Sequence, residues 1–197
     1  MFLREPPAGE DRDRHYASDR ESDGYVNNLT SLWCWRPDVL EAFTALRQMT
    51  LEGSTLSERE VAVLVAAAAS TLSDSYCSLA WGARLAELTS EETAADVLSG
   101  APAQGLSERE RLLADWARAV VRDPNGTTAV DVERLRGAGL SDAEVFQATA
   151  FVAFRVAFST VNDALGAQPD AQLARAAPGA VLTAVGYGRP PASADSA

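Results

Sequence analysis

The residues best suited to chemistry lie in one short stretch around Cys77. The run from Asp74 to Cys77, DSYC, puts a thiol just after a polar break and at the start of an apolar segment. A thiolate can attack the O–O bond of a peroxide and become a sulfenic acid, and a second thiol can then condense with it to a disulfide. Cys77 is therefore the candidate reactive group for thiol-based redox chemistry.

The surroundings of Cys77 decide how readily its thiol ionises. If Asp74 is the N-cap of the following helix, Cys77 occupies the third helical position, near unsatisfied N–H groups and the positive end of the helix dipole. Those groups favour the thiolate, whereas the Asp74 carboxylate disfavours a second negative charge beside it. The sequence leaves open which of the two effects is larger.

Other residues that could do chemistry are few. Cys34 lies between two tryptophans, a setting typical of a buried and inert thiol. His15 is the sole histidine and lies among charged residues, so we expect it to be solvated. One histidine and two distant cysteines make no metal-ligand cluster, and no serine has a histidine partner in view. No glycine-rich phosphate loop follows a strand. We therefore expect no metal and no cofactor.

Composition limits the classes of partner. The chain has 197 residues, 47% of them hydrophobic, which fits one globular domain with a sizeable core. A net charge of −11 argues against nucleic acid and anionic membrane surfaces. Two cysteines fit a reducing compartment. The first residues lack the apolar segment of a signal peptide, and the longest apolar run, 148–158, is about half a membrane span. We expect a soluble, cytoplasmic protein.

Repeated helix-start signals indicate the fold class. The phrase LSERE occurs at 56–60 and 106–110, and a looser copy, LSDAE, occurs at 140–144. Each copy has a serine followed three residues later by a glutamate, which is a capping box. With little strand-like alternation anywhere, these starts predict an all-α protein. The expected helices are 38–52, 57–71, 75–88, 90–99, 107–122, 129–137 and 141–165, with a weaker one near 170–176.

The last long helix should be central. It is apolar on nearly all sides from Val145 to Phe158. Arg155 lies within this run, and a buried arginine needs a carboxylate partner or must reach solvent along its stem. We expect an acidic partner, for which Glu60 is a candidate.

The ends of the chain differ in composition from the middle. Residues 1–23 are rich in Asp, Glu and Arg and include two prolines, typical of a flexible arm or of an arm ordered only against a partner subunit. Residues 24–177 carry the helical pattern and form the predicted domain. Residues 178–197 are low in complexity and predict a loose tail.

The order of several segments resembles the alkylhydroperoxidase D and carboxymuconolactone decarboxylase superfamily, and most of all its peroxidase-related branch. The resemblance covers about residues 24 to 170. It implies an all-α helical bundle of about seven or eight helices that assembles into homodimers, trimers or hexamers, with the site in the helical core. The segments that carry it, in order, are GYVNNLTSLWCWRPDVLEAFTAL, LSEREVAVLVAAA, YC, GLSERERLLADWARAVVRDP, VERLRGAGLSDAEVFQATAFVAF and VNDALG.

The family's catalytic phrase is Cys-x-x-Cys-x-x-x-His, often with a tyrosine before the second cysteine. Anchored on Tyr76 and Cys77, the phrase puts its second cysteine on Cys77, its first on Asp74 and its histidine on Trp81. One of the three catalytic positions is thus retained, and Asp74, Tyr76 and Trp81 become pocket residues. The same residues also fit an ordinary buried helix start.

The family also uses a glutamate early in the preceding helix as part of a proton relay. Glu60 is the matching residue in this chain. The reciprocal capping bond with Ser57 is by itself a sufficient reason for a glutamate at position 60, without any catalytic role. Both roles remain open from the sequence.

Three functions follow from the resemblance. The first is a thiol-dependent peroxidase, an antioxidant oxidoreductase with peroxiredoxin-type activity, in which Cys77 is reset by an external thiol reductant or by Cys34. The second is an inactive oligomeric scaffold or small-molecule binder. The third, a carboxymuconolactone decarboxylase-like lyase, depends on a histidine, and none lies outside the N-terminal arm. Trp81 separates the first two: an indole that fills the site favours the binder, and one that points away favours the peroxidase.

Overall fold

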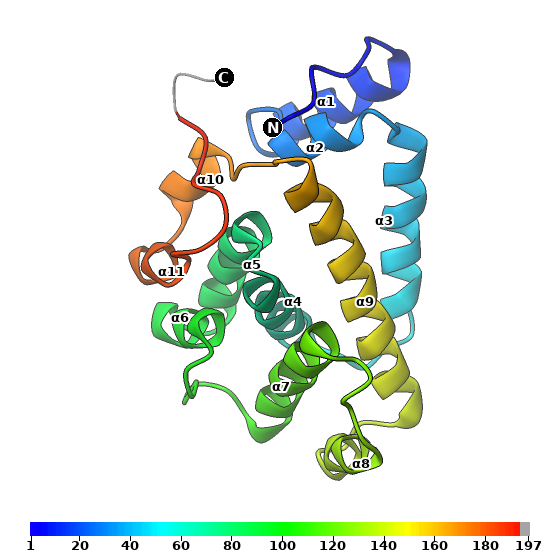
Figure 1. Ribbon diagram of the computed structural model, residues 1–197, viewed down its shortest axis with the longest axis vertical. Coiled ribbons are helices and arrows are strands. Elements are labelled where there is room, and N and C mark those ends of the chain that lie inside the picture. Colours follow the sequence, from blue (N-terminus) through cyan, green and yellow to red (C-terminus); the bar gives the residue numbers. More distant parts are fainter. Residues whose placement is uncertain (194–197) are drawn as a thin grey trace.

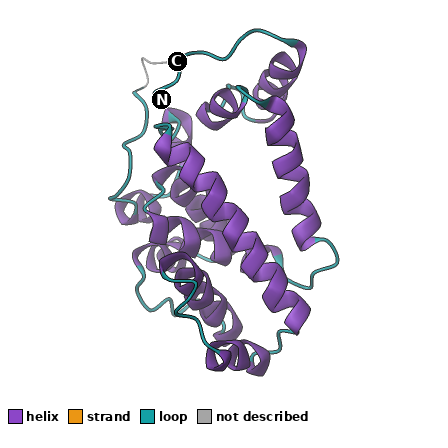
Figure 2. Cartoon of the chain, turned by 45° about the vertical axis from the view of Figure 1, so that its right-hand side comes forward, coloured by secondary structure: helices purple, strands orange, loops and turns teal. Residues whose placement is uncertain are grey.

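The computed structural model describes residues 1–193, and residues 194–197 of the predicted tail lie outside this description. The described chain consists of helices and loops without strands, as Figures 1 and 2 show, so the predicted all-α class is confirmed. The helices are α1 (Glu10–Ser22), α2 (Asn28–Trp33), α3 (Pro37–Leu51), α4 (Glu58–Leu72), α5 (Ser75–Leu88), α6 (Glu91–Ser99), α7 (Glu108–Arg122), α8 (Ala129–Gly137), α9 (Asp142–Ala164), α10 (Ala171–Ala176) and α11 (Gly179–Ala184).

Helix α9 runs along the long axis of the molecule, with α3 on one side and α4, α5 and α7 on the other (Figure 1). Its face toward α4 and α7 is apolar and includes Ala148 and Val152, both fully buried. Phe146, one turn from the start of α9, is 72% exposed. The helix is therefore central, but only part of its apolar circumference is covered by the chain.

The core is built on the small-residue run of α4. Residues 62–69 of this helix are each at most 2% exposed. Alanine side chains let neighbouring helices approach closely, and α4 packs most extensively against α5 and α7. The small residues of α4 thus allow close packing between helices of the same chain.

The predicted capping boxes form at the starts of α4, α7 and α9. The first two copies of LSERE also pair with each other. Arg59 of the first copy meets Glu110 of the second at 2.5 Å, and Arg109 of the second meets Glu60 of the first at the same distance. This reciprocal pairing joins the beginnings of α4 and α7, so the repeated phrase stabilises both the helix starts and their packing.

The N-terminal segment differs from the flexible arm expected over residues 1–23. Residues 10–22 form α1, which packs on α2 and α3. Tyr16 anchors it, since its ring is buried and its hydroxyl lies 2.8 Å from both Glu5 Oε1 and Ser31 Oγ. The charged composition of residues 1–23 gave no indication that Tyr16 would be buried.

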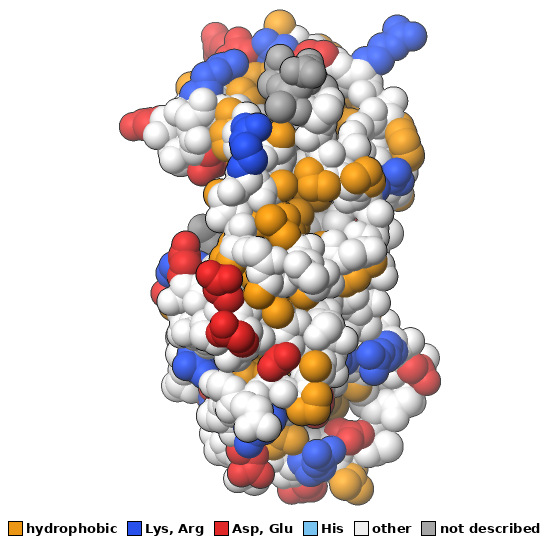
Figure 3. All heavy atoms as spheres, turned by 90° about the vertical axis from the view of Figure 1, so that its left-hand side faces the viewer, with side chains coloured by type: hydrophobic (Ala, Val, Ile, Leu, Met, Phe, Trp, Pro, Cys, Tyr) orange, Lys and Arg blue, Asp and Glu red, His pale blue; other side chains and the backbone are white. Residues whose placement is uncertain are grey.

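The C-terminal segment also differs from expectation, because residues 178–193 cover the start of α5. Val181 of α11 is fully buried. Gly188 has a φ of +71°, and a Cβ there would lie 2.5 Å from the Ser73 carbonyl oxygen. Only glycine allows the tail to approach α5 so closely. On the face formed by α6, α10 and α11, apolar side chains gather across the middle (Figure 3).

Within the described residues, no helix combines the length and the apolar character needed to cross a membrane.

We expect Arg109→Met to lower the free energy of unfolding by about 3 kcal/mol, because it leaves buried Glu60 and Glu144 without their shared cation. Urea denaturation at neutral pH measures this change. Arg84→Met is the matched control: it removes an exposed pair with Glu58 and should cost no more than about 1 kcal/mol. Equal losses in the two variants would contradict the role given to the buried pair.

Candidate functional site

Cys77 is the third residue of α5, and Asp74 is the N-cap of this helix, so the condition considered for the sequence is met. One Asp74 carboxylate oxygen, Oδ1, accepts the Cys77 backbone N–H at 2.9 Å. The other, Oδ2, accepts the Ser159 hydroxyl of α9 at 2.5 Å. Asp74 is fully buried. The carboxylate therefore fixes the start of α5 against α9 and has both of its oxygens occupied.

The sulfur of Cys77 faces a guanidinium. Arg155 of α9 donates from Nη2 to Cys77 Sγ at 3.2 Å, and its side chain is almost wholly buried. The expectation of a carboxylate partner for Arg155 is wrong, because no carboxylate of the described residues forms an ion pair with it. Glu60, the expected candidate, is bound by Arg109 instead. The most deeply buried arginine among the described residues thus donates to a sulfur atom.

Burial sets the ionisation of Cys77. Removal from water raises the pKa of the Cys77 thiol to about 12; Arg155 acts in the opposite direction, and the Asp74 carboxylate adds to the rise. Desolvation disfavours the charged form of a thiol. The balance that the sequence leaves open therefore favours the neutral thiol at neutral pH, because of burial, with Arg155 as the main opposing group.

Trp81, which the sequence resemblance aligned with a histidine, lies beside Cys77 and Arg155. Its ring packs in the cluster that contains Cys77 and Phe158. The Arg155 guanidinium lies over the rings of Trp81 and Phe158, 5.7 and 5.3 Å from their centroids. The indole is thus part of the site, and it makes a cation–π contact with Arg155.

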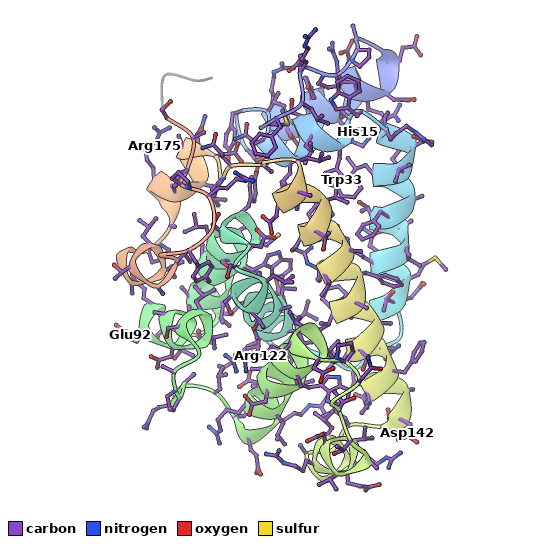
Figure 4. The ribbon with its side chains drawn as sticks, viewed as in Figure 1. His15, Trp33, Glu92, Arg122, Asp142 and Arg175 are labelled. Atoms are coloured by element: carbon purple, nitrogen blue, oxygen red, sulfur yellow. The ribbon has the colours of Figure 1, made fainter. Side chains whose placement is uncertain are left out.

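A second arginine reaches the same aromatic cluster from α3. The Arg47 guanidinium lies 5.3 Å from the Phe158 centroid and 5.8 Å from that of Phe43. Burial and the charge of Arg155 lower the pKa of Arg47 to about 10, so Arg47 stays protonated at neutral pH. Trp33 stacks on Phe158 at 4.9 Å and lies where α2, α3 and α9 meet (Figure 4).

Tyr76 and Glu60 point to other partners. The Tyr76 hydroxyl donates to Asp170, just before α10, so this tyrosine ties α5 to the C-terminal segment. Glu60 accepts bonds from Ser57 and Arg109. Glu58, two residues before Glu60, pairs with Arg84. Arg84 lies about 10 Å further along α5 than Cys77, so Glu58 is also away from the thiol. The structure therefore brings Asp74, Cys77 and Trp81 together, whereas Glu60 is committed elsewhere.

The remaining candidates also lie in separate contacts. Cys34 is buried, and burial raises its pKa to about 11. It is a free thiol, as is Cys77. His15 lies on α1 beside the beginning of α3, where its Nε2 is 3.3 Å from a Glu41 oxygen (Figure 4). A lyase that depends on histidine therefore finds no support at the Cys77 site.

Sequence reasoning missed Arg47, Trp33 and Ser159. A weak signal existed, since Arg155 and Ser159 are four residues apart, as are Phe43 and Arg47, and such pairs share a helix face. The sequence does not show how α3, α5 and α9 pack against one another, and only that packing brings these helix faces together.

The architecture is that of an alkylhydroperoxidase D-like protein, and the resemblance seen in the sequence is confirmed at the level of the fold. No family model matches the chain, and no curated protein matches it. Several solved structures do match it.

Three of these structures illustrate the likeness. An uncharacterized peroxidase-related protein from Silicibacter sp. TM1040 is 24% identical with a TM-score of 0.76, covering 87% of this chain and 93% of that one. The alkylhydroperoxidase AhpD core of a peroxidase-related protein from Ralstonia eutropha JMP134 is 23% identical with a TM-score of 0.73, over the same shares. A variant of the debrominase Bmp8 in complex with 2,3,4-tribromopyrrole is 15% identical with a TM-score of 0.70, covering 89% and 96%.

We expect the alkylation rate of Cys77 by iodoacetamide to keep rising with pH beyond the value of about 8.5 at which a free thiol ionises, because burial raises its pKa. Arg155→Met should slow the reaction at pH 8, since it removes the cation that favours the thiolate. Mass spectrometry of the Cys77 peptide measures both rates. Arg36→Met, which alters an exposed pair with Asp38, is the control and should react like the wild type.

Proposed function

We propose that the chain is a slow, one-cysteine thiol peroxidase in which Arg155 is the counter-ion of the Cys77 thiolate. One observation carries this proposal: a buried guanidinium donates to Cys77 Sγ at 3.2 Å and has no carboxylate partner among the described residues. A neighbouring arginine lowers the free energy of a thiolate relative to the thiol. The peroxidase-related names of two solved neighbours support the same chemistry.

The reaction has two parts. The Cys77 thiolate attacks one oxygen of a hydroperoxide, an S–O bond forms as the O–O bond breaks, and the departing alkoxide takes a proton to leave as an alcohol. An external thiol then attacks the Cys77 sulfenic acid and releases water, and a second external thiol frees Cys77 from the mixed disulfide. Asp74 cannot replace the missing resolving thiol, because a carboxylate cannot form a disulfide.

A non-catalytic binder is the second candidate. Cys77 is 3% exposed, and Trp81 lies in the site where the family has its histidine. Both features favour binding over turnover, since a filled site limits the access of a peroxide. The debrominase neighbour, solved with a brominated pyrrole, supports a small-molecule role for this fold.

We expect a sulfenic acid to form on Cys77 when the reduced protein meets cumene hydroperoxide in a single turnover, as read by mass spectrometry of the trapped adduct. Cys77→Ser should give no adduct. Arg155→Met should slow adduct formation by about tenfold or more, because it raises the pKa of the thiol and so lowers the thiolate fraction. Arg36→Met should leave the rate unchanged. An adduct that forms no faster than on a free thiol would leave the binder as the function.

We propose further that the chain forms homo-oligomers, with α3 and the start of α9 in the interface. Met49 is 66% exposed and Phe146 is 72% exposed, and no residue of α3 is fully buried. Exposed apolar side chains that share one helix face, as Val39, Leu46 and Met49 do on α3, form a patch of the kind that marks contacts between subunits. We also propose that the chain is cytoplasmic, because Cys34 and Cys77 are free thiols and such thiols are typical of a reducing compartment.

We expect sedimentation at micromolar concentration to show a dimer or a larger assembly. Phe146→Glu should shift the population toward monomer, because it puts a charge into the apolar contact. Val130→Glu, at a side chain that is also exposed but lies on α8, should leave the assembly unchanged. A wild-type monomer would contradict the proposal.

A further inference from the structure

Five buried side-chain nitrogen atoms in the described residues have no hydrogen-bond partner. Two of them, on His15 and Arg59, face carboxylates in ion pairs. The other three are Arg47 Nε, Arg155 Nε and Asn162 Nδ2. All three are donors, so a group that satisfied them would have to accept hydrogen bonds.

These three donors surround one aromatic cluster. The guanidinium carbons of Arg47 and Arg155 each lie 5.3 Å from the Phe158 ring centroid. Asn162 uses its oxygen to accept the Trp33 indole N–H at 2.8 Å, which leaves its amide nitrogen free, and Trp33 itself stacks on Phe158. The donors therefore belong to residues that adjoin one aromatic cluster rather than being scattered through the core.

The charges at this place do not balance among residues 1–193. Two guanidinium groups lie close enough for the charge of Arg155 to lower the pKa of Arg47. No described carboxylate forms an ion pair with either. Asp74 is nearby, but its oxygens accept bonds from the Cys77 backbone and from Ser159. Arg155 has the Cys77 sulfur as an acceptor, whereas Arg47 has no hydrogen-bond acceptor at all among the described residues.

An unpaired buried charge destabilises the folded state, and an anion that enters the site offsets that cost. A carboxylate matches a guanidinium well, because two parallel N–H donors meet two oxygens. The rings of Trp33, Phe43 and Phe158 supply an apolar wall for the rest of a small molecule. The chemistry of this site therefore selects an organic acid with an apolar or aromatic body.

We propose that Arg47, Arg155 and Asn162 form a binding site for the carboxylate of a small aromatic acid, which enters along α3. Arg47 is half-buried, whereas Arg155 and Asn162 are buried, so the path runs from α3 inward. If the peroxidase activity proposed above holds, the same site favours hydroperoxides that bear an acid group; binding itself does not depend on that activity.

Benzoate is the probe, and benzamide, which has nearly the same shape and no charge, is its control. We expect benzoate to bind saturably, detected by calorimetry and by a change in the fluorescence of the neighbouring tryptophans, and benzamide to bind at least about tenfold more weakly, because a charge-assisted hydrogen bond is lost. Arg47→Gln should weaken benzoate binding by about tenfold or more. Arg36→Gln, at an exposed position just before α3, should bind like the wild type. Thermal unfolding shows whether each variant is folded.

Cys77→Ser separates this inference from the proposed reaction. We expect it to bind benzoate as the wild type does while losing the sulfenic acid adduct. No saturable benzoate binding, equal affinity for benzamide, or an equal loss in Arg36→Gln would each overturn the site. Benzoate binding without peroxide reactivity would overturn the peroxidase alone and leave the acid-binding site in place.

Discussion

The contact between Arg155 and Cys77 is the interaction on which the site depends. A guanidinium buried in the central helix normally needs a carboxylate, because an unpaired charge in the core is costly. Here the side chain meets a thiol at 3.2 Å and two aromatic rings. A neutral thiol compensates this charge only partly, so the site is completed either by ionisation of Cys77 or by an anion from outside.

Those two outcomes compete for the same positive charge. Ionisation of Cys77 makes a nucleophile, and burial opposes it. An incoming carboxylate can occupy Arg47 and Arg155 while the thiol stays neutral. Under the two proposals above, the pair of arginines serves both catalysis and binding, and the Trp81 indole beside Cys77 favours binding because it limits the access of a peroxide.

The rest of the fold holds this centre in place through polar groups at helix starts. Asp74 caps α5 and ties it to Ser159 of α9. The two LSERE phrases exchange their arginine and glutamate partners and so join α4 to α7. Because these contacts lie at helix ends, the middle of α4 is free to pack through alanines against both neighbours.

The sequence by itself determined the eight helices from α3 to α10, the capping boxes that begin α4, α7 and α9, and the all-α class, because these depend on local patterns of residue type. It also predicted that Arg155 lies in a central helix. Only the tertiary structure decided that Arg155 meets Cys77, that Glu60 is held by Arg109, and that Arg47 and Trp33 reach the same rings. Those contacts join residues far apart in the chain, and their geometry follows from how α3, α5 and α9 cross.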